Sequence, residues 1–133
     1  MSNYFPAEWH PQQAIQITWP HSDTDWNWII DEAQAFYYKL AKTILTLQEL
    51  IISVPNEKLK KELEQSFKNS KFNCHIFICP SNDTWTRDHG PISVFSNGIL
   101  ETQDYQFNGW GNKFEAQLDN QITRTLFEKG AYK

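Results

Sequence analysis

The stretch Leu50-Ile51-Ile52-Ser53-Val54 sets the fold class expected of this chain. It is a short, nearly continuous apolar run, which is typical of a central strand covered on both faces. Pro55-Asn56 ends the run. Helical patterns lie on both sides of it, and further strand patterns lie beyond those helices. The stretch therefore predicts a buried strand within a layered α/β domain.

On the N-terminal side of this run, the pattern predicts one strand and one long helix. The strand covers residues 15–19 and is stopped by Pro20. Residues 21–26 are polar and form a loop. The helix is expected because apolar residues recur at spacings of three and four: Ile29, Ala33, Phe36, Leu40, Ile44 and Leu47, with Tyr37, Ala41 and Leu45 beside them.

On the C-terminal side, a second helix and a third strand are expected. Asn56 is the candidate N-cap of this helix, and its inward residues are Leu59, Leu63 and Phe67. Apolar residues then alternate over residues 72–78, which indicates a strand that Pro80 terminates.

The rest of the chain predicts a hairpin and a last helix. Asn97-Gly98 is a strong signal for a two-residue turn between strands at 92–95 and 99–107. The helix is expected over residues 116–128, with Gly130 as its C-terminal stop. Strands and helices therefore alternate along most of the chain, which favours an α/β layer architecture. The chain stops after a helix, where another strand would be due, so we expect a truncated domain.

Composition and charge narrow the class of protein. The 133 residues suffice for one domain, and 40% hydrophobic with 15% aromatic content argues for a packed globule. A formal net charge of -4 gives no support to binding of nucleic acid or an anionic membrane. No apolar run approaches the length of a bilayer span, and the start Met1-Ser2-Asn3-Tyr4 lacks a signal region. We therefore expect a cytoplasmic protein.

The cysteines and histidines show no metal-binding spacing. Cys74 and Cys79, the only cysteines, are five residues apart, so on a strand they would point to opposite faces. They are interpreted as two buried, inert thiols in a reduced compartment rather than a disulfide or zinc site. The four histidines are not paired in sequence, and the one beside Asp88, His89, is the only candidate for a contact with a ligand.

The chemistry is concentrated in Trp85-Thr86-Arg87-Asp88-His89-Gly90-Pro91. A guanidinium is planar and always charged, and it is bound best by carboxylates whose oxygens match its N–H pairs. Asp88 is placed for that role, and Trp85 could lie against such a ligand. Gly90 would allow close approach of the backbone, and Pro91 would fix the turn. From spacing alone, an ordinary Arg–Asp surface pair beside a packing Trp explains the cluster equally well.

Four motifs, in order along the chain, resemble those of agmatine deiminases and bacterial-type peptidylarginine deiminases. The opening motif is weak alone, whereas the second and third together are specific. Asn112 and Phe114 depart from the family pattern, which leaves the choice between a free amine and a peptide substrate open. The motifs are FPAEWHP at residues 5–11, ITWPH at 17–21, NDTWTRDHGP at 82–91 and DYQFNGWGNKF at 104–114.

The resemblance implies a role for each matching residue. Asp88 matches the catalytic carboxylate that holds the substrate guanidinium, and Trp85 matches the aromatic lining beside it. Arg87 would support the loop by pairing with a carboxylate, for which Asp83 is the candidate, and Gly90 and Pro91 would shape the loop. Substrate-binding residues in the fourth motif would be Asn108, Trp110 and Gly111.

The resemblance also implies a fold and an activity. The fold would be a partial pentein propeller, with about the first ββαβ-type unit and part of the second. Residues 1–133 would form the N-terminal fragment of a guanidine-modifying hydrolase that converts agmatine and water to N-carbamoylputrescine and ammonia in putrescine biosynthesis. The family needs no cofactor or metal, and its nucleophilic Cys and catalytic His are absent from this chain. The full-length protein could be a homo-oligomer.

Two other functions stay open at this point. One is a peptidylarginine deiminase of the same family. The other is a self-standing α/β module that binds a cationic ligand, or another partner, without turnover. We expect the chain alone to be inactive, since Cys79 reads as a packing thiol with no base to activate it.

Overall fold

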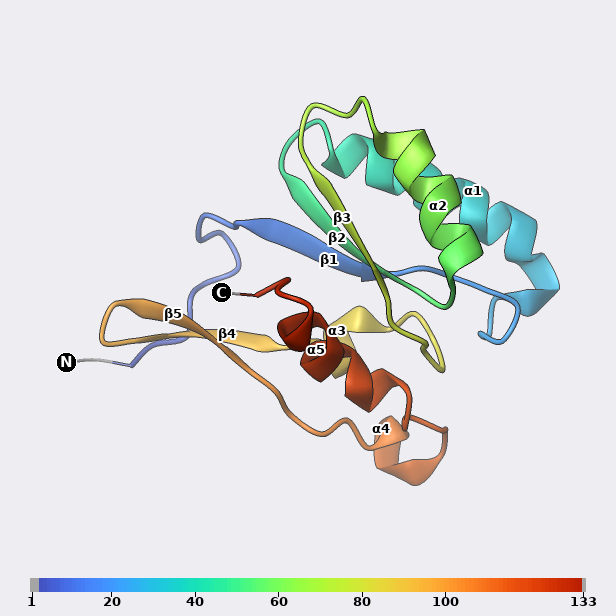
Figure 1. Ribbon diagram of the computed structural model, residues 1–133. Coiled ribbons are helices and arrows are strands. Elements are labelled where there is room, and N and C mark those ends of the chain that lie inside the picture. Colours follow the sequence, from blue (N-terminus) through green and yellow to red (C-terminus); the bar gives the residue numbers. More distant parts are fainter. Residues whose placement is uncertain (1–2, 133) are drawn as a thin grey trace.

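A parallel sheet of three strands forms the centre of the molecule (Figure 1). The strands β1 (Ala14–Thr18), β2 (Glu49–Val54) and β3 (Cys74–Ile78) lie in the order β1-β2-β3. The computed structural model describes residues 3–132, so Met1, Ser2 and Lys133 lie outside the described residues. β2 is buried from its second residue to its last, which confirms the central strand expected at residues 50–54.

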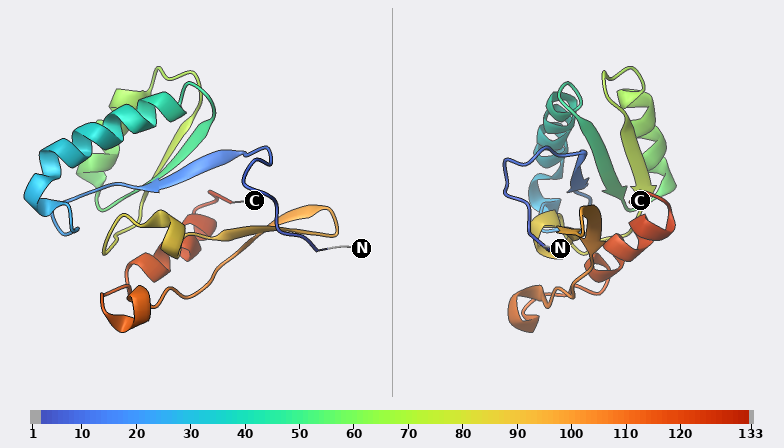
Figure 2. Two further views of the ribbon diagram at one scale, coloured as in Figure 1. Left: turned by 180° about the vertical axis from the view of Figure 1, so that it is seen from behind. Right: turned by 90° about the vertical axis from the view of Figure 1, so that its left-hand side faces the viewer.

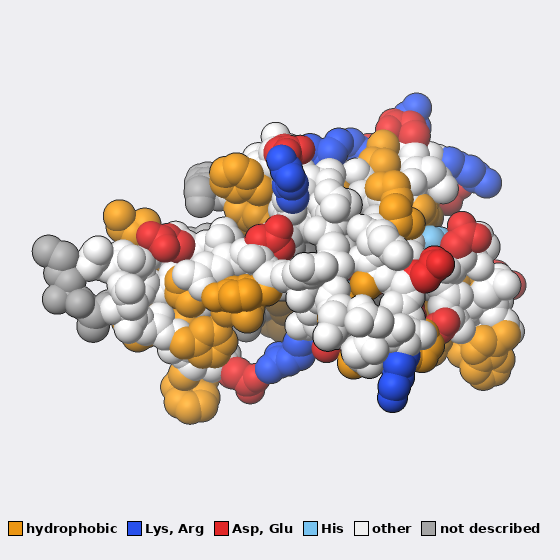
Figure 3. Space-filling view, turned by 90° about the horizontal axis from the view of Figure 1, so that it is seen from below, with side chains coloured by type: hydrophobic (Ala, Val, Ile, Leu, Met, Phe, Trp, Pro, Cys, Tyr) orange, Lys and Arg blue, Asp and Glu red, His pale blue; other side chains and the backbone are white. Residues whose placement is uncertain are grey.

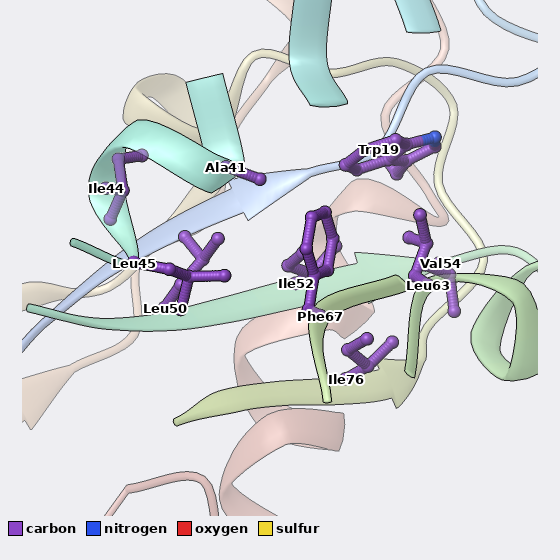
Figure 4. Packing of buried hydrophobic residues seen from close by; sticks show 10 residues of the cluster. All are labelled: Trp19, Ala41, Ile44, Leu45, Leu50, Ile52, Val54, Leu63, Phe67 and Ile76. Carbon is purple, nitrogen blue, oxygen red and sulfur yellow. The ribbon is translucent and has the colours of Figure 1, made fainter. Parts of the chain in front are cut away.

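Two helices cover one face of this sheet. A 3₁₀ turn, η1 (Asn27–Ile29), leads into α1 (Ile30–Ile44), and α2 (Glu57–Phe67) follows β2. Asn56 caps α2 as expected, because its side-chain oxygen accepts a hydrogen bond from the Leu59 N–H at 3.0 Å. Figure 4 shows the core between these layers, in which each large buried side chain contributes about 1.5–3 kcal/mol. It contains Trp19, Ala41, Ile44, Leu45, Leu50, Ile52, Val54, Leu63, Phe67 and Ile76.

The opposite face of the sheet packs against α5 (Asp119–Glu128), so the fold has three layers (Figure 2). Ile122 and Leu126 of α5 are buried against Ile51 and Cys79. Cys74 packs in the other cluster, which confirms that the two cysteines lie on opposite faces. The expectation that both thiols are buried is correct for Cys79, but Cys74 is only half-buried, because it lies near the start of an edge strand.

A two-stranded hairpin projects from this layered body (Figure 1). It consists of β4 (Ile92–Ser96) and β5 (Ile99–Gln103), which turn at Asn97-Gly98 with positive φ at both residues, as the sequence predicts. The expected extension of the second strand to residue 107 is wrong. Ile92 pairs with Gln103, and Pro91 before it has no N–H with which to continue the ladder.

Two helix ends also differ from the sequence pattern. α1 stops at Ile44, so Leu45 is buried in the following turn and Leu47 is 71% exposed. The cause is the tight turn into β2, in which Leu47 and Gln48 both bond back to the Ile44 carbonyl. α5 begins at Asp119 rather than at residue 116, because the backbone of its first turn is capped by a side chain from another loop, described below. Within residues 3–132, no helix is both long and apolar enough to cross a membrane.

Candidate functional site

Asp88 lies on α3 (Thr86–His89), a single helical turn that follows β3 after a seven-residue loop. The Thr86 hydroxyl donates to the Thr18 hydroxyl at 3.0 Å, which fixes α3 at the C-terminal end of β1. The turn closes when the Gly90 N–H bonds to the Thr86 carbonyl at 2.7 Å. A Cβ at Gly90 would lie 2.5 Å from that carbonyl oxygen, so the turn has no room for a side chain at this position.

The Asp88 side chain is exposed. Among the described residues its carboxylate makes no hydrogen bond or ion pair, so both oxygens remain available to a ligand. A guanidinium-binding role requires that the carboxylate is not buried among packed side chains. The exposed Asp88 side chain meets this requirement. The alternative interpretation of an Arg87–Asp88 surface pair is wrong, because Arg87 bonds elsewhere.

Trp85, which directly precedes α3, is held by its indole N–H, which donates to the Asp83 carboxylate at 3.0 Å. Asp83 also accepts from the Thr84 N–H at 2.8 Å, so it joins two neighbouring residues of the loop. Burial raises the pKa of Asp83, an effect that its bond to the Thr84 backbone partly offsets. Two further rings face Trp85, Trp26 at 6.5 Å and Trp110 at 6.2 Å between centroids. Trp26 was not predicted as a site residue.

Arg87 does not pair with Asp83, so that expectation is wrong. Its guanidinium donates to the Glu8 carboxylate at 2.6 Å, and both side chains are largely exposed. Glu8 belongs to the first motif, and 79 positions separate the pair in sequence. Asp83 is already engaged by Trp85 and Thr84, and Arg87 leaves the helical turn on the side of the N-terminal segment. No local pattern could have shown this partner.

The fourth motif forms α4 (Gly109–Asn112), a turn in which all four residues have positive φ. Such a conformation costs about 1–2 kcal/mol at each residue other than glycine, and Trp110 adopts it with φ 54°. At Gly109 a Cβ would lie 2.1 Å from the Phe114 carbonyl oxygen, so glycine is required there. The strain directs Trp110 towards Trp85 and into contact with Phe107 and Phe114.

Asn108 and Gly111 have a local structural role in this turn. The Asn108 side-chain oxygen accepts from the Gly111 N–H at 3.0 Å and caps the turn. Both residues are exposed. Of the substrate-binding residues expected in this motif, Trp110 is therefore the one whose ring the structure brings against Trp85, while Asn108 and Gly111 shape the turn that carries it.

A reciprocal clamp, which the sequence did not reveal, joins the Asp88 loop to α5. The buried Asp119 carboxylate accepts from the backbone N–H groups of Asn82 at 2.7 Å and Asp83 at 3.3 Å. In return, the Asn82 side-chain oxygen accepts from the N–H groups of Leu118 at 2.8 Å and Asp119 at 3.3 Å, and so caps α5. The bonds to Asp119 are charge-assisted, and the four bonds together position the loop from which Trp85 and Asp88 project.

Two histidines lie buried beneath the loop. His89 is 2% exposed and sits between α3 and α5, where the Thr123 hydroxyl donates to its backbone carbonyl at 3.4 Å. Burial lowers the pKa of His89, against the opposing effect of Asp119. His21 bonds to the Ser81 hydroxyl at 3.0 Å, and burial lowers its pKa as well. The imidazole of His89 is therefore withdrawn from the surface on which Asp88 lies, and a direct ligand contact is excluded in this conformation.

Two open depressions of about 220 and 270 Å³ lie away from Asp88. One runs between the N-terminal segment and the hairpin, and the other lies beside residues 104–106. Residues 3–132 hold no group of three or more His, Cys, Asp or Glu side chains placed to bind a metal ion. Large apolar side chains are exposed on several elements, and Figure 3 shows such clusters on the face seen from below.

The fold is similar to that of solved deiminases. C. jejuni agmatine deiminase, solved with substrate bound, superimposes with a TM-score of 0.87 at 33% identity, over 98% of this chain and 38% of that one. Relatives named "Putative agmatine deiminase" are 30% identical in Shewanella baltica and 32% identical in Legionella pneumophila. The alignments cover 97% and 94% of this chain but 35% and 36% of those proteins. The chain thus spans about a third of the length of the curated relatives it matches.

This mixed α/β architecture is a partial pentein, the fold class that the solved deiminases define. The model of the Porphyromonas-type peptidyl-arginine deiminase family matches residues 4–133. The chain belongs to that family, and the resemblance seen in its motifs is confirmed.

Proposed function

We propose that this chain is the N-terminal part of an agmatine deiminase-type hydrolase and supplies the carboxylate that binds the guanidinium. The observation that carries the proposal is the exposed, unpaired Asp88 carboxylate, which lies on the helical turn that begins directly after Trp85. A carboxylate that is free in the absence of ligand can form two parallel charge-assisted hydrogen bonds with a planar guanidinium. An aromatic face beside it favours the same delocalised cation.

The proposed reaction converts agmatine and water to N-carbamoylputrescine and ammonia. We propose that the attacking cysteine and the proton-relaying histidine, which the family resemblance implies, lie outside residues 1–133. Cys79 is a poor substitute, because it is buried and burial raises the pKa of its thiol. We therefore propose that residues 1–133 form a fragment of the hydrolase domain and have no deiminase activity alone. The exposed apolar side chains are consistent with a chain that functions as part of a larger unit.

The substrate proposed is a small cationic guanidine. Two acidic side chains lie near Trp85, since Asp83 accepts its indole N–H and Asp25 interacts with Asp83, and the adjacent cation Arg87 is paired to Glu8. A substrate without a carboxylate suits such surroundings better than free arginine does. The names of the relatives in Shewanella and Legionella also support agmatine. Peptidyl-arginine is the second candidate, favoured by the description of the matching family model.

The wider role follows from this substrate. We propose that the complete enzyme works in the cytoplasm within putrescine biosynthesis and needs no cofactor or metal. No nucleic acid or membrane partner is proposed, and a homo-oligomer is compatible with the family.

Ammonia release from agmatine tests the proposal. The purified 133-residue chain should release none above background, whereas the full-length enzyme should be active. In that enzyme Asp88→Ala should lower kcat/KM about 100-fold or more, because two charge-assisted hydrogen bonds are lost. Asp31→Asn, at an exposed carboxylate on α1, is the matched control and should leave the rate unchanged. A near-normal rate in the Asp88 variant would show the assignment to be wrong.

A further inference from the structure

Arg87 carries the same chemical group that the neighbouring Asp88 is proposed to bind. Both side chains are exposed, and they occupy consecutive positions on α3. A group on so short a tether has a local concentration in the millimolar range, which is enough to compete with a weakly bound ligand. An unrestrained Arg87 would also place a positive charge close to the approaching cation and repel it. A contact that holds this guanidinium away from Asp88 would prevent both effects.

Glu8 is the residue that does so in the structure. Its carboxylate accepts a hydrogen bond from the Arg87 guanidinium at 2.6 Å. The segment that carries Glu8 is attached to β4 on both sides of this residue. Before it, Tyr4 exchanges two backbone hydrogen bonds with Phe95, at 3.0 and 2.9 Å, and their rings stack at 4.9 Å. After it, the His10 ring lies 5.3 Å from that of Phe95.

We infer that Glu8 is a positioning residue for the Asp88 site, which holds the Arg87 guanidinium and neutralises its charge so that the Asp88 carboxylate stays open to a cationic ligand. The inference rests on the proposed function. Consecutive side chains on a helical turn point in different directions, so a partner on the far side of Arg87 is sufficient to hold it there. The N-terminal segment thus acts on the site without touching the ligand.

The ordinary alternative is that the Glu8–Arg87 pair only ties the N-terminal segment to the loop. Exposed ion pairs contribute little to stability. If the ion pair only attaches the segment, removal of either partner breaks it equally. Glu8→Gln and Arg87→Gln would then have the same effect on ligand binding. The inference predicts opposite behaviour, because removal of Glu8 frees a competing cation, whereas removal of Arg87 eliminates it.

The test is a titration of the 133-residue chain with agmatine, followed through the NMR signal of the Trp85 indole N–H. Glu8→Gln should weaken binding about three- to ten-fold. Arg87→Gln should bind at least as tightly as the parent chain, and the double variant should behave like Arg87→Gln. The loss in Glu8→Gln should shrink at about 1 M salt, where the Debye length is about 3 Å. Glu128→Gln, which breaks the exposed pair with Arg124, is the matched control and should bind as the parent does.

Distinct results would overturn the inference and the proposed function. Two results would overturn the inference alone, provided that Asp88→Ala abolishes binding. One is that Glu8→Gln and Arg87→Gln weaken agmatine binding equally, and the other is that Glu8→Gln leaves the dissociation constant for agmatine unchanged. Failure of the parent chain to bind agmatine would also overturn the inference alone, because Asp88 would then not be open to a cationic ligand in this chain. Unimpaired binding by Asp88→Ala would overturn the proposed function and the inference with it. Because Glu8 and Arg87 are exposed, signals far from the loop should coincide with those of the parent in both variants.

Discussion

Replacement of Asp119 by alanine should destabilise the chain by about 3 kcal/mol, although this residue lies outside every sequence motif. The carboxylate accepts from two backbone N–H groups, at 2.7 and 3.3 Å, and it is 2% exposed. Leaving a buried donor without a partner costs about 1–3 kcal/mol, and the longer bond is the weaker of the two. Loss of a negative charge from the first turn of α5 adds about 0.3–1 kcal/mol.

Urea denaturation of the parent and variant chains measures this change in the free energy of unfolding. Asp119→Asn keeps the accepting oxygen and loses the charge, so it should cost about 1 kcal/mol. Asn82→Ala removes the cap of α5 and should cost about 1–2 kcal/mol. Because both residues belong to one clamp, the double variant should lose less than the sum of the single variants. Gln121→Ala, at an exposed position of α5, is the control.

If Asp119→Ala lowered the free energy of unfolding by less than about 0.5 kcal/mol, as the control does, the clamp would not hold the loop. Strict additivity of Asp119→Ala and Asn82→Ala would also contradict the clamp, because independent sites do not form one.

Three further properties should follow from the structure. Burial lowers the pKa of His21 and His89 from 6.5, so below about that pH the unfolded chain binds more protons than the folded one. The free energy of unfolding should therefore stay level above about pH 7.5 and fall as the pH drops from about 6.5 to about 5.5. If urea titrations showed that it rises as the pH drops over that interval, the two histidines would not be buried as described. Gly109→Ala should destabilise the chain by more than about 2 kcal/mol, because its Cβ would meet the Phe114 carbonyl, whereas Gly111→Ala, with φ +82° but open space, should cost about 1 kcal/mol. Cys79 should react slowly with a thiol reagent in the folded chain and rapidly in urea, since burial raises its pKa; fast labelling of the folded protein would show the thiol to be accessible.

Local patterns predicted most of the architecture. The apolar run at residues 50–54, the helical spacing before it and the Asn97-Gly98 turn each describe contacts between residues close in sequence, and the structure confirms these elements. Their ends were less predictable. β5 stops where its partner strand begins, and α5 starts where Asn82 caps it, so both limits depend on distant residues.

The candidate site also has a part that could be predicted from the sequence and a part that could not. Asp88, Trp85 and Gly90 could be named as candidates from the chain, because they lie in one short motif and that motif resembles a family signature. The contacts that hold this loop could not: Glu8 lies 79 positions from Arg87, and Asp119 lies 37 from Asn82. Periodicity reports which face of an element is buried but not which loops meet across the molecule. Such contacts depend on how the layers pack. Packing brings Glu8 of the first motif to the Arg87 side chain and Asp119 of the last helix to the backbone of Asn82 and Asp83, at two places along one loop.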